Sequence, residues 1–339
     1  MRRLYAVLAL ILLAISGCVS PRRGGTVSGG GGGGGTGGQL YVSTAGSILH
    51  FSNAETSNGN VAPVNTITGT STQLSAPQHL FMDTSADRLY VANQGGSSIL
   101  VFDNVSALNG NAGPTRAISG NATHLTAPID VALDATNNLL YVADGTTILV
   151  FSSASIVNGN VPPVRNINMG VSIGGILLDV TNDQLYVSDP ADNVINRLDG
   201  ASTQDVVGIV GGVIAGADTK LSQPRGLALD ASGRLLVSNS AAPVSITVYP
   251  NASIASGDVI PVADITGSNT LLRAPGQITL NRAVANGELY VADPLAASIL
   301  IFTGLNNTTG NLAPARNISG SNTGLTANAI NGLAIDPTR

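Results

Sequence analysis

The chain has 339 residues, of which 41 are glycine and only 10% are charged, and its formal net charge is −5 at pH 7. Trp is absent, Lys220 is the single lysine, and 18 of the 20 acidic residues are Asp. Helix formers with charged ends are therefore scarce, while Val, Ile, Thr, Asn and Gly are abundant, which indicates strands and turns. This composition argues against coiled coils, helical bundles and polybasic nucleic-acid-binding proteins.

The first residues have the pattern of a secretion signal. Met1-Arg2-Arg3 is positively charged, and the apolar run from Leu4 to Ile15 is shorter than the ~20 residues that span a bilayer. It ends in Ile15-Ser16-Gly17-Cys18, which resembles the lipobox of bacterial lipoproteins. That resemblance implies cleavage before Cys18 and acylation of its thiol and new amino group. An ordinary signal peptide with a chance cysteine is the alternative. Either way the mature chain forms no internal disulfide, because Cys18 is the only cysteine.

The residues after the cysteine predict an anchored, flexible start. Val19 stands where an Asp would, by the same resemblance, indicate retention in the inner membrane, so we expect the outer membrane of a bacterial envelope. The glycine run from Gly29 to Gly35 cannot bury enough surface to order itself. We therefore expect a signal peptide over 1–17, a lipidated Cys18 with a flexible tether over 18–38, and a folded domain over 39–339.

The folded domain repeats a pattern of about fifty residues. A short apolar run ending in Asp or Asn recurs at spacings of 51, 45, 51, 51 and 55 residues: Leu80–Asp83, Val131–Asp134, Ile176–Asp179, Leu227–Asp230, Ile278–Asn281 and Leu333–Asp336. Each of the first five is followed by a second strand marked by Tyr or Leu, by a third strand as in 98–102, and by a weaker fourth. Four antiparallel strands in about fifty residues are typical of a propeller blade.

The two ends of the domain predict how the ring closes. The segment Leu40-Tyr41-Val42 has no inner strand before it, and the last inner strand, 333–335, has no Tyr-Val strand after it. If both fragments belong to one blade, no sheet edge of an open array is left exposed. We therefore predict an all-β, six-bladed β-propeller of four-stranded antiparallel blades, closed by the C-terminal strand pairing with the N-terminal blade.

Two segments carry a family resemblance. The stretch 128–134, Pro-Ile-Asp-Val-Ala-Leu-Asp, followed by Leu-Tyr-Val-Ala-Asp at 140–144, resembles the NHL repeat family, and Tyr-Val-Ala-Asn at 90–93 is similar to the related YVTN-type repeats. The resemblance spans 40–336 and implies the propeller fold but little chemistry, because relatives range from binding scaffolds to lyases and lactonases. The fourth unit, 172–215, departs from the pattern, since Ile173 replaces a proline. The sequence leaves open whether this blade is distorted or has a special role.

Recurring polar residues are interpreted as turn chemistry. The Asp that ends each inner strand is expected to accept hydrogen bonds from amides of the following turn. In the Asn-Gly-Asn triplets at 58–60, 109–111 and 158–160, the glycine is expected to adopt a left-handed conformation.

Polar residues that differ between the repeats predict a site at one mouth of the channel. We expect six side chains to converge there from the starts of the inner strands and the turns between second and third strands: His79, Asp130, Asp144, Asp189, Arg225 and Asp293. A histidine among carboxylates could hold a divalent cation such as Ca²⁺, with His79 as acid or base. The alternative is a wet polar funnel in which Asp130 pairs with Arg225 or His79.

Two functions remain open at this stage. The first is an envelope lipoprotein without enzymatic activity or cofactor, whose propeller binds a protein, peptide or glycan. The second is a metal-assisted hydrolase or lyase, similar to lactonases, with Asp130, Asp144, Asp189 and Asp293 as candidate ligands. Nucleic acid is not an expected partner, because beyond residue 38 the chain carries 11 basic against 20 acidic residues.

Overall fold

The computed structural model describes residues 37–205, 211–284, 287–305 and 309–339. These residues belong to the unit Gly35–Arg339. The expected signal peptide, Cys18 and nearly all of the expected tether lie outside the described residues. Within the described ranges, no helix has the length and apolar character that crossing a membrane requires.

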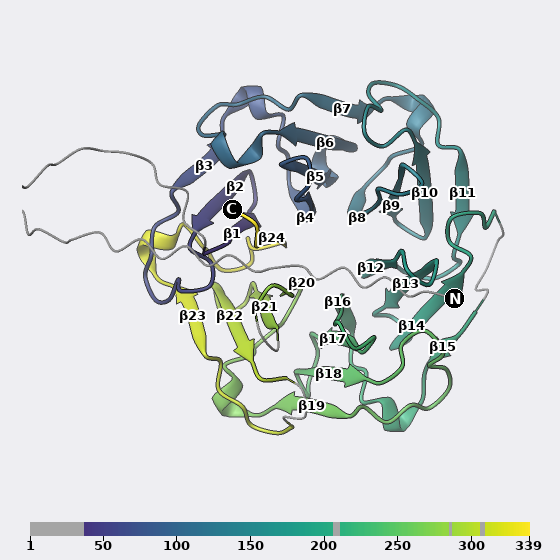
Figure 1. The fold of residues 1–339 in the computed structure, drawn as a ribbon, viewed down its shortest axis with the longest axis vertical. Helices are drawn as coiled ribbons and strands as arrows, with labels where there is room; N and C mark the ends of the chain where they lie inside the picture. Colours follow the sequence, from purple (N-terminus) through teal and green to yellow (C-terminus); the bar gives the residue numbers. More distant parts are fainter. Residues whose placement is uncertain (1–36, 206–210, 285–286, 306–308) are drawn as a thin grey trace, which may run out of the picture. The chain divides into compact units, whose positions relative to one another are not determined.

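Six four-stranded antiparallel sheets, the blades, build this unit (Figure 1). Blade one contains β24 (Gly332–Asp336), β1 (Gln39–Ser43), β2 (Ser47–Ser52) and β3 (Asn65–Thr68). Blade two contains β4 (Pro77–Asp83), β5 (Arg88–Asn93), β6 (Ser98–Asp103) and β7 (Arg116–Ser119). Blade three contains β8 (Pro128–Asp134), β9 (Leu139–Asp144), β10 (Thr147–Ser152) and β11 (Arg165–Asn168).

The other three blades follow in chain order. Blade four contains β12 (Gly175–Asp179), β13 (Gln184–Asp189), β14 (Val194–Asp199) and β15 (Val213–Ile214). Blade five contains β16 (Pro224–Leu229), β17 (Leu235–Asn239), β18 (Ser245–Tyr249) and β19 (Ala263–Thr266). Blade six contains β20 (Ile278–Asn281), β21 (Glu288–Asp293), β22 (Ser298–Thr303) and β23 (Arg316–Ser319). Short 3₁₀ helices occupy the loops: Thr70–Thr72, Gln94–Gly96, Val105–Ala107, Asn121–Thr123, Ala217–Thr219, Ser268–Thr270 and Ser321–Thr323.

The predicted ring closure is confirmed. β24 pairs with β1 in antiparallel register, with Leu40 opposite Ile335 and Tyr41 opposite Ala334. The inner strands β4, β8, β12, β16, β20 and β24 each contact the next one around the ring. The C-terminal strand therefore completes a sheet that the N-terminal strands begin, and this sheet is blade one (Figure 1).

The hydrophobic core lies between the blades. Each of six clusters of buried apolar side chains joins two neighbouring blades, because both faces of every sheet pack against another sheet. The tyrosines of the second strands lie in this core and are at most 1% exposed: Tyr41, Tyr90, Tyr141, Tyr186 and Tyr290. Successive residues of a strand point to opposite faces of its sheet, so they pack against the two neighbouring blades in turn.

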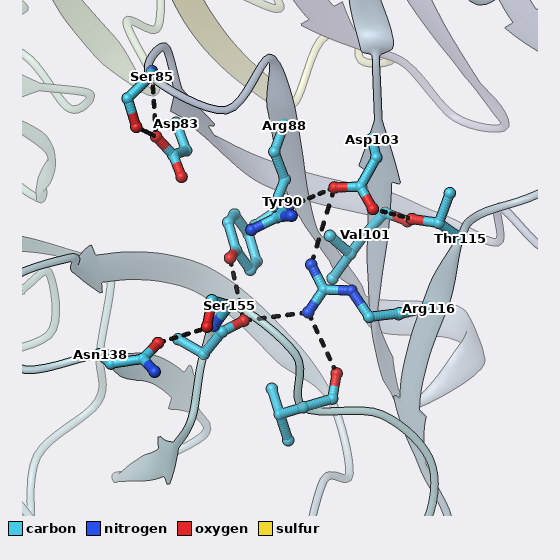
Figure 2. A network of polar contacts seen from close by, with 12 residues as sticks. Asp83, Ser85, Arg88, Tyr90, Val101, Asp103, Thr115, Arg116, Asn138 and Ser155 are labelled. Carbon is cyan, nitrogen blue, oxygen red and sulfur yellow. Dashed lines mark hydrogen bonds and ion pairs between the residues drawn. The ribbon is translucent and has the colours of Figure 1, made fainter.

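A tyrosine and an arginine connect blades two and three (Figure 2). The hydroxyl of Tyr90 and Nη1 of Arg116 both donate to the carbonyl oxygen of Ala154, at 3.1 Å each, and Arg116 also reaches the carbonyl of Val157. We call this pair of donors a staple. Tyr141 and Arg165 repeat it on the carbonyl of Ala201 in blade four. An ion pair of Arg88 with Asp103 flanks the first staple. Burial raises the pKa of Asp103, but the hydrogen bond and the charge of Arg88 outweigh burial and hold this pKa below its ordinary value.

The Asn-Gly-Asn triplets form a second connection between blades. The side-chain oxygens of Asn158 and Asn160 accept hydrogen bonds from the amides of Ala117 and Ala122 in blade two, while Gly159 bridges to Ile118. Gly159 has φ = 79°, so the left-handed glycine is confirmed. We call this contact a clasp. Equivalent glycine bridges occur at Gly59, Gly110, Gly257 and Gly310. The sequence predicted the turn but not its bond to the preceding blade.

Blade four is irregular, which the sequence left open. Its outer strand β15 has only two residues. Where the clasp of this blade would lie, the sequence reads Asp205-Val206-Val207, and residues 206–210 lie outside the described ranges. The third strand β14 carries Arg197, whose Nη1 donates to the carbonyl oxygens of Ala252 and Ala255 in blade five. An arginine on a different strand therefore contacts the same loop position that the staples contact elsewhere.

Turn roles for the aspartates that end the inner strands are also confirmed. Each of these carboxylates accepts a hydrogen bond from an amide two or three residues further along: Asp83, Asp134, Asp179, Asp230 and Asp336. Asn281 does the same in blade six.

Candidate functional site

One pair of the six expected channel-mouth residues is in contact. Nδ1 of His79 lies 3.0 Å from Oδ2 of Asp130, outside the direction of a hydrogen bond, and the two residues are 9% and 3% exposed. Both carboxylate oxygens of Asp130 also accept backbone hydrogen bonds, from Val131 and from Ile176 of the next blade. The carboxylate therefore joins two inner strands besides facing the histidine.

The other four expected residues contact groups of their own blades. Asp144 accepts hydrogen bonds from Thr126 and Ala127, just before the inner strand of blade three. Asp293 does the same for Arg273 and Ala274 in blade six. Asp189 accepts from Ala191, and Nε of Arg225 donates to Ser240. The turns and the strand starts do lie at the same end of each blade, yet these side chains fix local loops.

The residues at this mouth do not fit a divalent cation. Ca²⁺ takes six to eight oxygen ligands and catalytic Zn²⁺ three protein ligands. Within the described ranges no three His, Cys, Asp or Glu side chains come close enough to hold a metal ion. The two oxygens of Asp130 already accept two amide hydrogen bonds. The sequence-based hypothesis of a carboxylate cluster around His79 is therefore not matched by the geometry, and we derive no step through a metal.

The channel itself is a cavity of about 520 Å³. All six inner strands line it with mostly aliphatic side chains, among them Phe81, Leu178, Leu229 and Leu280. Asp130 and Gln277 are its polar lining at the strand starts, and Oε1 of Gln277 accepts a hydrogen bond from the amide of Leu333. These polar groups link neighbouring inner strands.

A second set of candidate residues lies in the loops that lead from one blade into the next. Five of these loops share the sequence Gly-x-x-Thr-x-Leu, and the residue after the threonine has a positive φ of 59–72° and is exposed. We call these five the loop-tip residues: Gln73, His124, Lys220, Leu271 and Gly324. Their backbone is the same in each loop, whereas their side chains differ in size, charge and polarity.

The frame around each loop tip is held on two sides. The buried Thr123 hydroxyl donates to the carbonyl of Gly120 at 2.7 Å and accepts from the amide of Leu125, and the other four loops have the same bonds. On the other side, a Cβ on Gly120 would lie 2.6 Å from the clasp residue Asn160. The frame therefore requires its glycine and its threonine, while the tip residue is free to vary.

Sequence reasoning interpreted these loops as connections and missed their tips. The signal was present, because Gly-x-x-Thr-x-Leu recurs five times at 69–74, 120–125, 216–221, 267–272 and 320–325. A left-handed conformation at Gln73, His124, Lys220 or Leu271 is unfavourable for a residue with a side chain. Four of the five tips carry a side chain in spite of this backbone preference.

Comparisons with known proteins support the fold. The described chain is similar to a chain in the crystal structure of a nidogen/laminin complex, with a TM-score of 0.60 and 16% identity over 88% of this chain and 98% of that one. A functionally unknown protein from Desulfotomaculum acetoxidans matches with a TM-score of 0.54 and 14% identity, over 83% of this chain and 79% of that one. A protein of unknown function from Bacteroides caccae matches with a TM-score of 0.56 and 11% identity, over 88% and 98%. No protein-family model and no curated protein sequence matches the chain.

Proposed function

We propose that the protein is a lipoprotein of the bacterial envelope, anchored through Cys18 in the outer membrane, whose propeller is a scaffold that binds a protein, peptide or glycan. The observation that carries this proposal is the set of loop tips. A rigid frame repeated five times displays Gln73, His124, Lys220, Leu271 and Gly324 in the same backbone conformation. A constant frame with variable exposed side chains is typical of binding surfaces.

Two further observations support a binding role. The acidic residues that repeat are engaged by backbone amides, as for Asp134 and Asp144, and hold the fold. One similar structure, at 16% identity, comes from a nidogen/laminin complex and therefore from a protein that has a protein partner. Membership of the NHL-type repeat proteins is part of this proposal and rests on the repeats around Asp130 and Tyr141.

The anchor and the binding surface are tested separately. Metabolic labelling with an alkyne fatty acid should label the wild-type chain and not Cys18→Ser, and the label should fractionate with the outer membrane. For binding, the triple variant His124→Gly, Lys220→Gly and Leu271→Gly should lose at least tenfold in affinity for the ligand found on a glycan and peptide array. Glycine is the natural residue at the fifth tip, Gly324, so the fold is expected to tolerate these changes. A triple variant that binds as well as wild type would overturn the proposed surface.

The metal-assisted hydrolase or lyase keeps one supporting observation, the contact of His79 with Asp130. A histidine beside a carboxylate can act as an acid or a base. Asp130→Asn retains an acceptor for the amide of Ile176 while removing the charge that His79 faces. Hydrolysis of a lactone panel by wild type, lost in Asp130→Asn at unchanged thermal midpoint, would favour this function over the scaffold.

A further inference from the structure

The loop tips of blades three, five and six each stand beside a pocket made from equivalent residues. In blade three, His124 Nδ1 accepts from the side-chain amide of Asn166 at 3.1 Å. In blade five, Nζ of Lys220 lies 3.0 Å from Oδ2 of Asp264. Both tips therefore bond to a polar side chain on the outer strand of their blade, although Oδ1 of Asp264 has no partner among the described residues. The pocket of blade six differs from that of blade five at three positions.

The first departure leaves an amide without its partner. The tip of blade six is Leu271, which cannot hydrogen-bond and is 47% exposed. The residue on the outer strand is Asn317, and its buried Oδ1 has no hydrogen-bond partner among the described residues. Asn317 lines the pocket together with Leu271.

The second departure leaves a hydroxyl without its partner. In blades two and five, an asparagine at the end of the second strand donates to the serine opposite: Asn93 to Ser98 at 2.9 Å and Asn239 to Ser245 at 3.1 Å. In blade six, the asparagine is replaced by Asp293, whose oxygens accept from three backbone amides. The hydroxyl of Ser298, which is 2% exposed, is left unpaired within the described ranges and lines the pocket.

The third departure adds a cation. Thr126 and Ser222 precede the inner strands of blades three and five, and Arg273 takes this place in blade six. Arg273 is exposed, lines the pocket, and has no ion pair among the described residues. The nearby Asp293 carboxylate is fully buried beneath its three amide donors, which stabilise its charge. Arg273 is therefore available to an anion from solvent.

We infer that this pocket of blade six binds an acidic sugar, a hydroxyl-rich ring that carries a carboxylate or a phosphate. The guanidinium of Arg273 suits a carboxylate or phosphate in bidentate geometry. Ser298 Oγ and Asn317 Oδ1 can accept from sugar hydroxyls, and Ser268 and Ser319 add two more hydroxyl groups at the lining. The pocket measures about 350 Å³, within the range of small-molecule sites. The inference rests on the proposed function, since it specifies a glycan ligand for one loop tip.

Calorimetric titration of the full chain with glucuronate tests the assignment. Glucuronate should bind. Glucose and inorganic phosphate should each bind at least tenfold more weakly, because glucose lacks the negative charge and phosphate lacks the sugar hydroxyls. Glucose 6-phosphate separates the two sources of negative charge: binding as tight as glucuronate favours a phosphorylated sugar, and weaker binding favours a uronic acid. Absence of binding by both glucuronate and glucose 6-phosphate, or inorganic phosphate binding as tight as either sugar, would overturn the inference.

Variants place the ligand in this pocket. Arg273→Gln should weaken glucuronate binding at least tenfold, and Arg282→Gln, an exposed arginine of blade six that does not line this pocket, should leave it unchanged. Ser298→Ala should weaken binding several-fold while the thermal midpoint stays equal or rises, because it removes a buried hydroxyl without a partner. Equal loss in Arg273→Gln and Arg282→Gln would place the ligand elsewhere. If neither glucuronate nor glucose 6-phosphate binds while the triple glycine variant still loses its array ligand, the acidic sugar is wrong and the proposed scaffold stands.

Discussion

The junction between blades two and three and the junction between blades three and four are held by the same staple but differ in the clasp. In both, a buried tyrosine and an arginine donate to one alanine carbonyl: Tyr90 and Arg116 to Ala154, and Tyr141 and Arg165 to Ala201. The first junction adds the triplet 158–160, bonded to the outer strand of blade two. The second has no such triplet in its sequence, where 205–207 reads Asp-Val-Val.

This difference shows that the two connections are separable. At the junction without the clasp sequence, Arg165 donates at 2.7 and 2.8 Å to the carbonyls of Ala201 and Gln204, whereas Arg116 donates at 3.1 and 3.4 Å. At the junction of blades six and one, Arg316 donates to the carbonyl of Ala54 beside the clasp at Gly59, so the two connections occur together or apart.

The largest expected effect comes from removing a junction altogether. Deletion of residues 330–339 removes β24 and leaves blade one with three strands and an open edge at β1. We expect loss of cooperative unfolding or failure to fold, measured by circular dichroism during a thermal scan. A truncated chain that unfolds cooperatively at the wild-type midpoint would show that closure contributes little.

A charge between blades should cost less, but still several kcal/mol. Tyr141 is fully buried and donates to Ala201, so Tyr141→Asp would place a carboxylate among apolar side chains. The control Tyr141→Phe removes only the hydroxyl and should cost about 1 kcal/mol, because Arg165 still donates to the same carbonyl. Urea unfolding of both variants measures the difference. An aspartate no worse than the phenylalanine would mean that this site admits water.

A pair of arginine variants tests whether the staple contributes more to the free energy of unfolding where the clasp sequence is missing. Arg165→Met and Arg116→Met each remove two hydrogen bonds to carbonyls across a junction. We expect Arg165→Met to lower the free energy of unfolding by about 1 kcal/mol more than Arg116→Met, because charged donors at shorter distance contribute more. If urea unfolding shows the same loss of stability in both variants, the staple contributes equally with and without the clasp.

The smallest expected effect depends on pH and concerns the junction between blades one and two. His50 is 3% exposed and stacks on Tyr41 at 4.6 Å, where the tyrosines of blades two and three face Val101 and Val150. Burial lowers the pKa of His50 below its ordinary value, while the Asp87 carboxylate opposes that shift.

The sign of the pH dependence follows from this shift. The unfolded chain takes up the proton near pH 6.5, and the folded chain only at lower pH. The contribution of His50 to stability is therefore complete above pH 6.5 and is lost as the pH falls towards the folded pKa. Comparing urea unfolding at pH 7.5 and 5.5, we expect a smaller decrease in His50→Val than in wild type. If the free energy of unfolding decreases equally in both proteins, titratable groups other than His50 cause the decrease.

Most of the fold could be predicted because its determinants are local or periodic. The apolar runs ending in Asp or Asn mark inner strands, and the incomplete repeats around Tyr41 and Ile335 indicate the closure. Staples and clasps could not be predicted in the same way. They join residues such as Arg116 and Ala154, which lie 38 positions apart and come together only once the blades pack.

The candidate site was predicted less well, for a physical reason. Symmetry correctly places the turn acids and the strand starts at the same end of each blade. His79 and Asp130 do meet, but the turn acids bind backbone amides of their own blade, as Asp144 binds those of Thr126 and Ala127. The useful differences were instead in the loops, where Leu271, Asp293 and Arg273 of blade six stand in place of Lys220, Asn239 and Ser222 of blade five.

The position of β1 has a mechanical consequence. Hydrogen bonds to β24 on one side and to β2 on the other make β1 an interior strand of its sheet. A force pulling on the chain ahead of Gln39 along the strand direction would load two rows of hydrogen bonds in shear at once, instead of peeling an edge strand one bond at a time. The blade that closes the ring is thereby also suited to resist tension from whatever holds the N-terminal segment.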